Sequence, residues 1–324
     1  MKTIIRSIIV IFIFGASYYV SAQQQAQYSL YMMNNYTLNP AVGGTENYAD
    51  LKASVRAQWV GFEGAPKNFY ISGHTSLNKQ NPKFDDIKPM PFHGVGGYIY
   101  SDNTGPTTKL GAYGSYAFHL PITTKLTASF GAFVGLQQYR VDSETLKFHD
   151  DQFGVNDNAI NGLSTKLLPD AHVGVWIYHK NYYAGLALYQ LLNNQLDFET
   201  VPSATTTGKL NKHFFMTAGY RVPLTDDFTL VPSFVVKAVS PAPVQFDINA
   251  KLRYKQLGWA GISYRNKDAI VLLIGGTIKN KIDVGYAYDI TTSNVRNYSS
   301  GSHEIIIGYR IPTHNDVEPT SQFW

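Results

Sequence analysis

The chain has 324 residues, a formal net charge of +4, 15% charged residues and 14% aromatic residues. A balance this close to neutral excludes the strongly basic surface that nucleic-acid binding requires. The absence of cysteine excludes thiol chemistry, disulfides and Cys-ligated metal sites. Few charges together with 23 Tyr and 18 Phe are typical of a surface that meets both lipid and water.

Residues 1–22 have the pattern of a secretory signal peptide. Lys2 and Arg6 precede an apolar run, and a Val-Ser-Ala sequence ending at Ala22 provides small or compact residues at the cleavage site. We expect a mature chain that begins at Gln23 and carries a net charge of +2, because Lys2 and Arg6 leave with the signal peptide. An uncleaved anchor is the alternative, but the apolar run is too short to span a bilayer.

Residues 23–47 form an irregular leader segment rich in Gln, Asn and Tyr, which we expect to lie against the mouth of the domain that follows. Over 49–59, apolar and polar residues then alternate with a period of two. This period predicts a strand, because successive side chains of a strand point to opposite faces. The same clear alternation returns over 244–254, 282–290 and 303–311.

Weaker alternation predicts further strands between these segments. They lie near 67–77, 92–101, 107–119, 124–139, 170–178, 181–189, 211–222, 228–239, 257–265 and 269–278. The total is about fourteen, an even number typical of bacterial outer-membrane barrels. No mature segment is an apolar run of about 18 residues, so a membrane-embedded chain has to be a closed barrel. We therefore predict an all-β transmembrane antiparallel barrel over 48–312, followed by a C-terminal tail at 313–324.

The connections support a barrel whose N-terminus is periplasmic. Short turns fall on the periplasmic side, and long connections fall outside. The short turns are 179–181, 224–226, 255–256 and 279–281, and the long connections are 140–169, 190–210 and 291–301. The Pro-rich connection 78–91 is the exception, and it is either a distinctive periplasmic segment or a miscounted hairpin. A secreted β-sandwich also alternates, but both faces here are poorer in charge than a soluble sandwich requires.

The alternation directs charged residues of both signs toward the lumen. They are Lys52, Arg56, Asp247, Lys251, Arg253, Asp283, Asp289, Glu304 and Arg310. Mixed signs predict internal ion pairs that brace a plugged or narrow scaffold. A small-molecule porin is the alternative, because water-filled channels also carry mixed charge.

Motifs of catalysis are absent from the sequence. There is no G-x-S-x-G or H-E-x-x-H, so we expect neither an enzyme nor a cofactor. Acidic residues and asparagines around Asp150 and Asp157 offer oxygen ligands of the kind that Ca²⁺ prefers. Their spacing differs from that of an EF-hand, which favours a solvated loop with Asx turns over a metal site.

Several short motifs carry a family resemblance. In chain order they are Gln27-Tyr28, Leu38-Asn39-Pro40-Ala41 with Gly44, Arg56-x-Gln58-Trp59, Gly64-Ala65-Pro66, Gly94-Val95-Gly96-Gly97, Asp102-x-x-Gly105-Pro106, Asp283 to Asp289, and Gly301 to Ile305 with Tyr309. In this order and spacing the chain resembles the PorP/SprF family of type IX secretion, from about Gln23 to Ile311. Val42 stands where the family usually has an aromatic residue.

The resemblance implies a non-enzymatic protein in the outer membrane of a Gram-negative bacterium. It implies support for the export or surface attachment of an adhesin-type cargo with a type IX C-terminal signal, often in gliding motility, and for some members a link to the periplasmic secretion ring. No functional residue carries over from the family. Because long loops on rigid barrels often bind partners, the candidate interaction loops are those around Pro82, Asp150, Asp157, Val201 and Pro202.

Overall fold

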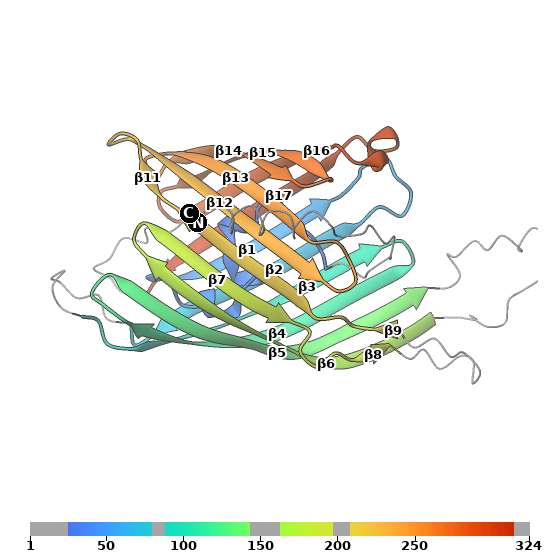
Figure 1. Ribbon diagram of the computed structural model, residues 1–324, viewed down its shortest axis with the longest axis horizontal. Coiled ribbons are helices and arrows are strands. Elements are labelled where there is room, and N and C mark those ends of the chain that lie inside the picture. The colour runs from blue at the N-terminus through green and yellow to red at the C-terminus, as the bar shows by residue number, and fades with distance from the viewer. Residues whose placement is uncertain (1–24, 80–87, 143–162, 197–207, 314–324) are drawn as a thin grey trace, which may run out of the picture.

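A computed structural model describes residues 25–79, 88–142, 163–196 and 208–313. The expected signal peptide and the tail beyond Thr313 lie outside these ranges. Across them, fourteen long antiparallel strands and the two-residue β11 form one sheet (Figure 1). The strands of this sheet are β1 (Tyr48–Ala57), β2 (Lys67–Leu77), β3 (Phe92–Thr104), β4 (Thr107–Pro121), β5 (Leu126–Asp142), β6 (Leu163–His179), β7 (Tyr182–Tyr189), β10 (His213–Tyr220), β11 (Val222–Pro223), β12 (Phe228–Val239), β13 (Gln245–Tyr254), β14 (Gly258–Arg265), β15 (Ala269–Ile278), β16 (Ile282–Thr291) and β17 (Ser302–Pro312).

The sheet is closed into a barrel. Each long strand pairs with its neighbours in the sequence, β1 pairs with β17 from Tyr48↔Pro312 onward, and β10 pairs with β12. No edge strand is therefore left among these long strands, which is the condition for a sheet in lipid. The predicted barrel of about fourteen strands is confirmed.

The two ends of the barrel differ in their connections. We call the end that carries 58–66, 190–212 and 292–301 the loop end, and the opposite end, with 180–181 and 279–281, the turn end. A small hairpin of β8 (Gln195–Leu196) and β9 (Gly208–Lys209) lies within the connection after β7. The 3-10 helix η7 (Asn294–Asn297) lies in the connection before β17.

The strand bounds differ from the prediction mainly at the loop end. We expected a connection over 140–169, but β5 continues to Asp142 and β6 begins at Leu163. These two strands pair over 17 residues each. Their extensions alternate weakly, and pairing with each other rather than a hydrophobic pattern keeps them extended. No additional hairpin interrupts the described parts of 78–91, whereas 80–87 lies outside the described residues.

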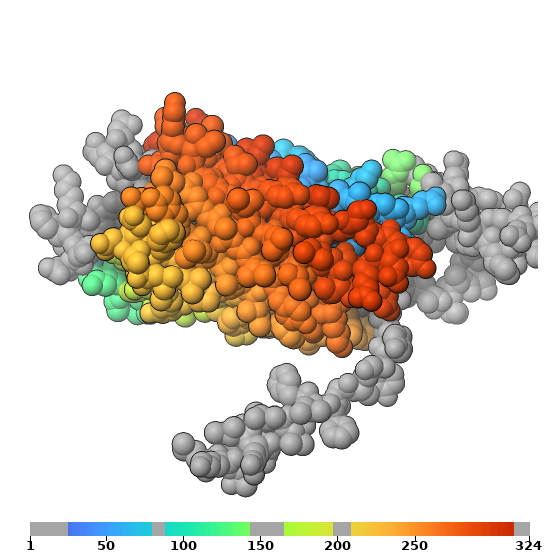
Figure 2. All heavy atoms as spheres, turned by 90° about the horizontal axis from the view of Figure 1, so that it is seen from above, coloured from blue at the N-terminus to red at the C-terminus, as the bar shows by residue number. Residues whose placement is uncertain are grey.

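The predicted facing of the strands is confirmed. Val55 and Ile248 are 58% and 55% exposed on the outer wall, while their neighbours Ser54 and Asn249 are buried inside. Figure 2 shows one outer face, where β12 to β17 form a continuous surface. All the charged residues predicted to point inward are buried, except Arg253, which is half-buried.

The residues before β1 fill the lumen. Three short 3-10 helices, η1 (Tyr31–Met33), η2 (Asn35–Thr37) and η3 (Pro40–Val42), lie inside the wall, and all their residues are buried. We call residues 25–47 the plug. The sequence led us to expect this segment at the mouth of the barrel, and that expectation was wrong because its polar groups find partners along the inner wall. No helix within the described ranges is long and apolar enough to cross a membrane.

Candidate functional site

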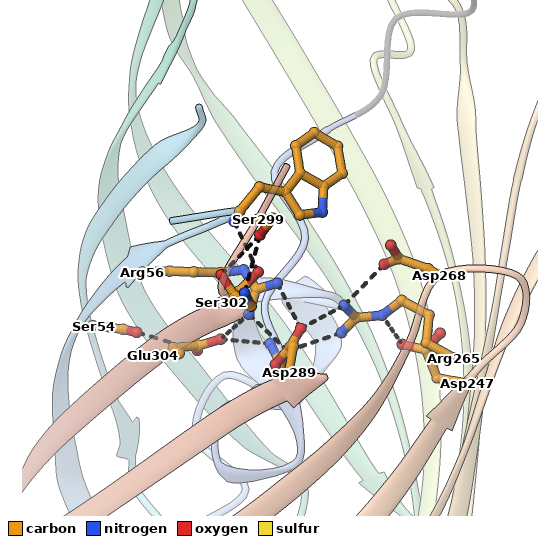
Figure 3. A network of polar contacts seen from close by, with 12 residues as sticks. Ser54, Arg56, Asp247, Arg265, Asp268, Asp289, Ser299, Ser302 and Glu304 are labelled. Carbon is orange, nitrogen blue, oxygen red and sulfur yellow. Dashed lines mark hydrogen bonds and ion pairs between the residues drawn. The ribbon is translucent and has the colours of Figure 1, made fainter. Parts of the chain in front are cut away.

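The plug enters the lumen at the loop end, where Ser29 meets a cluster of charges. Arg56 on β1 and Arg265 on β14 approach Asp289 on β16 from two sides (Figure 3). The Arg56 Nη2 lies 2.8 Å from the Asp289 Oδ2, and the Arg265 Nη1 lies 3.0 Å from the same oxygen. The Ser29 hydroxyl accepts hydrogen bonds from both guanidinium groups, at 2.7 and 3.0 Å, and donates to Asp289 at 2.8 Å. One plug hydroxyl therefore occupies the centre of an ion-pair network.

Further carboxylates complete this network, which we call the Ser29 cluster. The backbone N–H of Ser29 donates to the Glu304 Oε2 at 2.5 Å, and the same oxygen lies 3.4 Å from the Arg56 Nη1. Arg265 also pairs with Asp247 and Asp268, at 3.4 and 3.3 Å. Buried charges are stable when they are paired and hydrogen-bonded, and here the pairing joins the plug to the wall.

The predicted set of inward charges omitted Arg265. It belongs to the same alternation as its neighbours, because Ile262 and Tyr264 are exposed outside while Ser263 and Arg265 are buried inside. Extending the period of two along 257–265 would have found it. Without Arg265, the carboxylates of Asp247 and Asp268 would lack a shared counter-charge.

The middle of the plug is held by hydrogen bonds to neutral side chains. The Asn34 amide donates to the Ser72 hydroxyl at 2.8 Å. The Tyr36 hydroxyl shares a hydrogen bond of 2.6 Å with Ser115. Tyr36 also packs edge-on against Phe133, with ring centroids 5.0 Å apart, within a buried aromatic group at the centre of the barrel. The lumen at this level is filled by side chains.

The η3 part of the plug lies directly on the wall. The Asn39 side chain caps η3 by accepting from the Ala41 N–H at 3.0 Å, and it donates to the carbonyls of Val175 and Leu186 at 2.9 and 3.1 Å. A Cβ added at Gly174 would lie 2.0 Å from the Asn39 Oδ1. Asn39 therefore needs a wall position without a side chain.

A second glycine contact follows where the plug approaches the turn end. A Cβ added at Gly94 on β3 would lie 1.9 Å from the Gly43 carbonyl oxygen, and Gly44 has a left-handed φ of +86°. Such a conformation favours glycine. Two buried histidines bind the same peptide groups: His119 contacts the Gly43 oxygen at 2.7 Å, and His74 accepts from the Gly44 N–H at 3.2 Å.

The last plug residues are held from the turn end by Lys79. Its ammonium donates to the carbonyl oxygens of Thr45 and Glu46, at 2.5 and 3.1 Å. Burial lowers the pKa of the Lys79 amine to about 8, and the Glu46 carboxylate partly offsets this effect. The plug is thus bound to the wall from the loop end to the turn end.

A cavity remains at the loop end beside the first plug residues. It has a volume of about 650 Å³ and is lined by Gln25, Trp59, Asn68, Asp102 and Lys109, among others. An aromatic recess continues inward from it, lined by Tyr28, Tyr70, Tyr98, Tyr100, Tyr189 and Phe215.

The candidate residues from the sequence lie outside the described residues. These are Pro82, Asp150, Asp157, Val201 and Pro202. Their connections leave the wall next to described residues at both ends of the barrel. Among the residues that the structure describes, no group of three or more His, Cys, Asp and Glu side chains is arranged to hold a metal.

Several of the motifs that carried the family resemblance meet at the contacts between plug and wall. Asn39 and Gly44 are on the plug, Gly94 and Arg56 are on the wall, and Glu304 completes the Ser29 cluster. Segments from both ends of the sequence therefore contribute to the contacts that hold the plug in the lumen.

Comparisons with known proteins agree with this architecture. Among solved structures, a Pseudomonas aeruginosa FadL homologue matches with a TM-score of 0.52 and 9% identity, over 85% of this chain and 93% of that chain. The Pseudomonas putida toluene transporter TodX matches with a TM-score of 0.49 and 11% identity, over 90% of this chain and 95% of that chain. The first match shows that the fold is a closed barrel resembling FadL-type outer-membrane barrels. No curated protein matches the chain significantly.

The family comparison covers most of the chain. A family model described as "Type IX secretion system membrane protein PorP/SprF" matches residues 20–309, from before the plug to the last strand of the barrel. The chain belongs to the PorP/SprF family of type IX secretion system membrane proteins.

Proposed function

We propose that this barrel is a plugged scaffold that holds an exported, adhesin-type cargo protein at the cell surface through its loop end. The chain is a non-enzymatic outer-membrane protein of the type IX secretion system. The observation that carries the proposal is the plug. The plug fills the lumen and is bound to the wall from one end to the other. Only the two ends of the barrel are therefore left for binding a partner.

The loop end offers the larger binding surface. It has the cavity of about 650 Å³, the aromatic recess and the two longest connections, 143–162 and 190–212. Leu196 and Leu210 of the second connection pack with Tyr139 and Leu168 of the long hairpin. This packing supports a rigid base at the described part of the second connection.

The turn end is the proposed contact with the periplasmic machinery. Its turns are short, apart from 78–91. Lys79 joins the start of that connection to the end of the plug. A partner that binds 78–91 would therefore act close to the plug as well as to the wall.

A small-molecule porin is the alternative function, and the plug argues against it. A porin needs a continuous water-filled lumen, whereas the lumen here is crossed by buried residues from the Ser29 cluster to Lys79. The purified protein should show no large steady conductance in a planar bilayer. A stable open pore in the unmodified protein would favour the porin instead.

Loop replacement tests the cargo contact. We would replace 197–207 with Asn-Gly, a turn suited to joining two antiparallel strands, and keep β8 and β9 intact. The expected result is a folded, heat-modifiable barrel with several-fold less cargo at the cell surface. The matched control replaces 80–87 at the turn end, which should leave cargo bound to the barrel and reduce recovery of periplasmic ring components. Unchanged cargo display by the folded 197–207 variant would reject the proposal.

A further inference from the structure

The cavity and the aromatic recess at the loop end share part of their lining, including Gln25 and Tyr139. We call the two together the loop-end hollow. Its inner part is bounded by Thr37 and Leu38 of the plug, and the cavity alone has a volume of about 650 Å³. Pockets that hold small ligands usually measure about 300–1,000 Å³, so the hollow is large enough for a ligand.

The charged side chains in the lining of the hollow are already paired. Among the described residues, the Asp and Lys side chains that line it are Asp102, Lys109, Lys237, Lys267 and Asp268. All of them except the exposed Lys267 have a partner of opposite charge within 4.0 Å. The Asp102 carboxylate lies 3.9 Å from the Lys109 ammonium. It also accepts hydrogen bonds from Asn68 and Thr104, at 2.8 and 2.9 Å. The hollow therefore favours an uncharged ligand.

Uncharged polar groups remain available in the same hollow. Tyr98 is 8% exposed and Tyr100 is half-buried, and both line the recess. Within the described ranges their hydroxyl groups have no hydrogen-bond partner, and both oxygens keep some accessible surface. The side-chain amides of Gln58 and Asn266 line the cavity, also without a partner among the described residues. Hydroxyl and amide groups both donate and accept hydrogen bonds, and buried ones normally have a partner.

Flat aromatic surface lies beside these polar groups. The rings of Tyr98 and Tyr100 are stacked, with centroids 5.7 Å apart and 19° between their planes. Trp59 lines the cavity from the connection after β1, and its φ of +48° is a strained, left-handed conformation for a bulky residue. Its N–H donates to the Ser302 hydroxyl at 3.0 Å, which supports this conformation. Strained backbone is concentrated at functional sites, and here it places an indole in the cavity lining.

A neutral saccharide matches these three properties of the hollow. It has no charge, its hydroxyl groups both donate and accept, and each pyranose ring has an apolar face of C–H groups that can pack on an aromatic ring. A peptide is less suitable. Extended peptides are commonly bound at an unpaired strand edge, and the long strands of this closed barrel have no such edge.

We propose that the loop-end hollow is a binding site for a neutral saccharide. The rings of Trp59, Tyr98 and Tyr100 pack on the apolar faces of its sugar units. The two tyrosine hydroxyls and the amides of Gln58 and Asn266 exchange hydrogen bonds with its hydroxyl groups. The site lies at the end of the barrel to which we assign cargo, but it does not rest on that function.

Saturation-transfer NMR of the full-length barrel, in a detergent without a sugar headgroup, tests the proposal. The probes are maltose, cellobiose, lactose and diacetylchitobiose, and an uncharged capped triglycine peptide is the comparator. At least one of the four sugars should give a saturable signal, and the peptide should give none. No signal from any of these sugars would overturn the proposal, as would a peptide signal at lower concentration than every sugar.

Removal of two hydroxyl groups connects the signal to the recess. The double variant Y98F/Y100F should fold normally, because neither hydroxyl has a hydrogen bond to lose within the described ranges. It should weaken the sugar affinity at least about tenfold, since the ligand loses two hydrogen-bond partners. The control is Y264F on the outer wall of β14, which should keep the affinity within about twofold. Full affinity in the folded double variant would reject the site.

Trp59 provides a second test that is independent of these hydroxyls. W59G removes the indole and relieves the left-handed strain, whereas W59F keeps an aromatic ring at the same position. W59G should weaken the sugar affinity about fivefold or more, and W59F by less than about threefold. Equal affinities of the two variants would contradict packing of this ring on the sugar.

Competition identifies where the saccharide comes from. The sugar that binds the purified barrel is added to cargo that has been recovered on the barrel. Release of the cargo assigns the saccharide to the cargo itself, whereas retention assigns it to another component of the cell surface. Cargo binding by a barrel that gives no sugar signal would overturn this inference and leave the proposed function standing.

Discussion

At the loop end, four carboxylates surround the guanidinium groups of Arg56 and Arg265, whereas at the turn end no carboxylate of the described residues lies within 4.0 Å of the charged groups of Lys251 and Arg253. Both groups of charges lie on the inner wall of the same barrel. The Ser29 cluster is completed by a plug hydroxyl and a plug N–H.

The difference separates two uses of buried charge. A network whose members satisfy one another holds neighbouring segments in a fixed position. A buried cation without a carboxylate in contact lacks this stabilisation, because burying a charge is favourable only when the charge is paired and hydrogen-bonded. The loop-end cluster therefore has a structural role in retaining the plug, whereas Lys251 at the turn end has no ion pair of this kind to lose. Substitutions in the two places should have opposite effects.

The largest effect is expected from R56M. It removes the contacts of Arg56 with Ser29, Asp289 and Glu304, and leaves buried carboxylates without their counter-charge. Breaking a buried pair in this way costs about 3–5 kcal/mol. Urea unfolding of the barrel in lipid vesicles measures the free energy. R296Q is the control, because Arg296 is exposed in η7, and a loss under about 1 kcal/mol in R56M would show that the cluster is not structural.

A charge placed on the outer wall has a known free-energy cost, with which the effect of a substitution on the inner wall can be compared. I248R places a guanidinium on the lipid-facing side of β13, which costs about 2–4 kcal/mol near the bilayer midplane. N249A changes the neighbouring residue on the inner face, and it should reduce the folded yield less. Band-shift assays on membranes measure both variants. Equal folded yields would mean that the assigned facing of β13 is wrong.

The plug can be loosened without changing any charge. In G94A the new Cβ would clash with the Gly43 carbonyl oxygen, so the plug has to shift, at a cost of about 1–3 kcal/mol. We expect higher conductance in planar bilayers because the turn-end half of the plug moves away from the wall. G114A is the matched control, since a Cβ there meets nothing within 4 Å. Identical conductance of the two variants would contradict tight seating of the plug.

The smallest effect, and one of opposite sign to R56M, is expected from K251M. Removing this buried cation relieves its repulsion from Arg253, while the attraction to Asp283 and the contact with the Trp259 ring are lost. The variant should unfold at the same free energy as the unmodified protein or be more stable by up to about 1 kcal/mol. Destabilisation by more than that would show that Lys251 is already paired.

The wall of the barrel was predictable from the sequence because its signal is local. A period of two identifies a strand and assigns its faces without knowledge of its partners. For this reason Lys52, Asp247 and Glu304 were placed in the lumen correctly. The ends of β5 and β6 were harder to predict, because they are held by pairing with each other beyond the region of clear alternation.

The plug was not predictable in the same way. Its backbone has no regular period, and its decisive contacts join distant parts of the chain. Ser29 and Glu304 are 275 positions apart, and Asn39 and Val175 are 136 apart. The motif containing Asn39 and Gly44 was recognised, but a motif does not identify the wall residues against which it packs. Those positions include Gly94 and Gly174, which provide space rather than a contact of their own.

The position of the plug directly before β1 also constrains how the protein is made. Tyr48 pairs with Pro312, so the seam between β1 and β17 joins the first and last strands of the wall. We expect residues 25–47 to enter before this seam and the rest of the wall are complete, because their buried contacts run along the lumen from Ser29 to Glu46. Contacts across so long a stretch of chain make folding slow. Biogenesis should therefore proceed by capture of the N-terminal segment by a partly formed sheet, and weakening that capture should lower the rate of folding before it lowers the stability of the finished barrel.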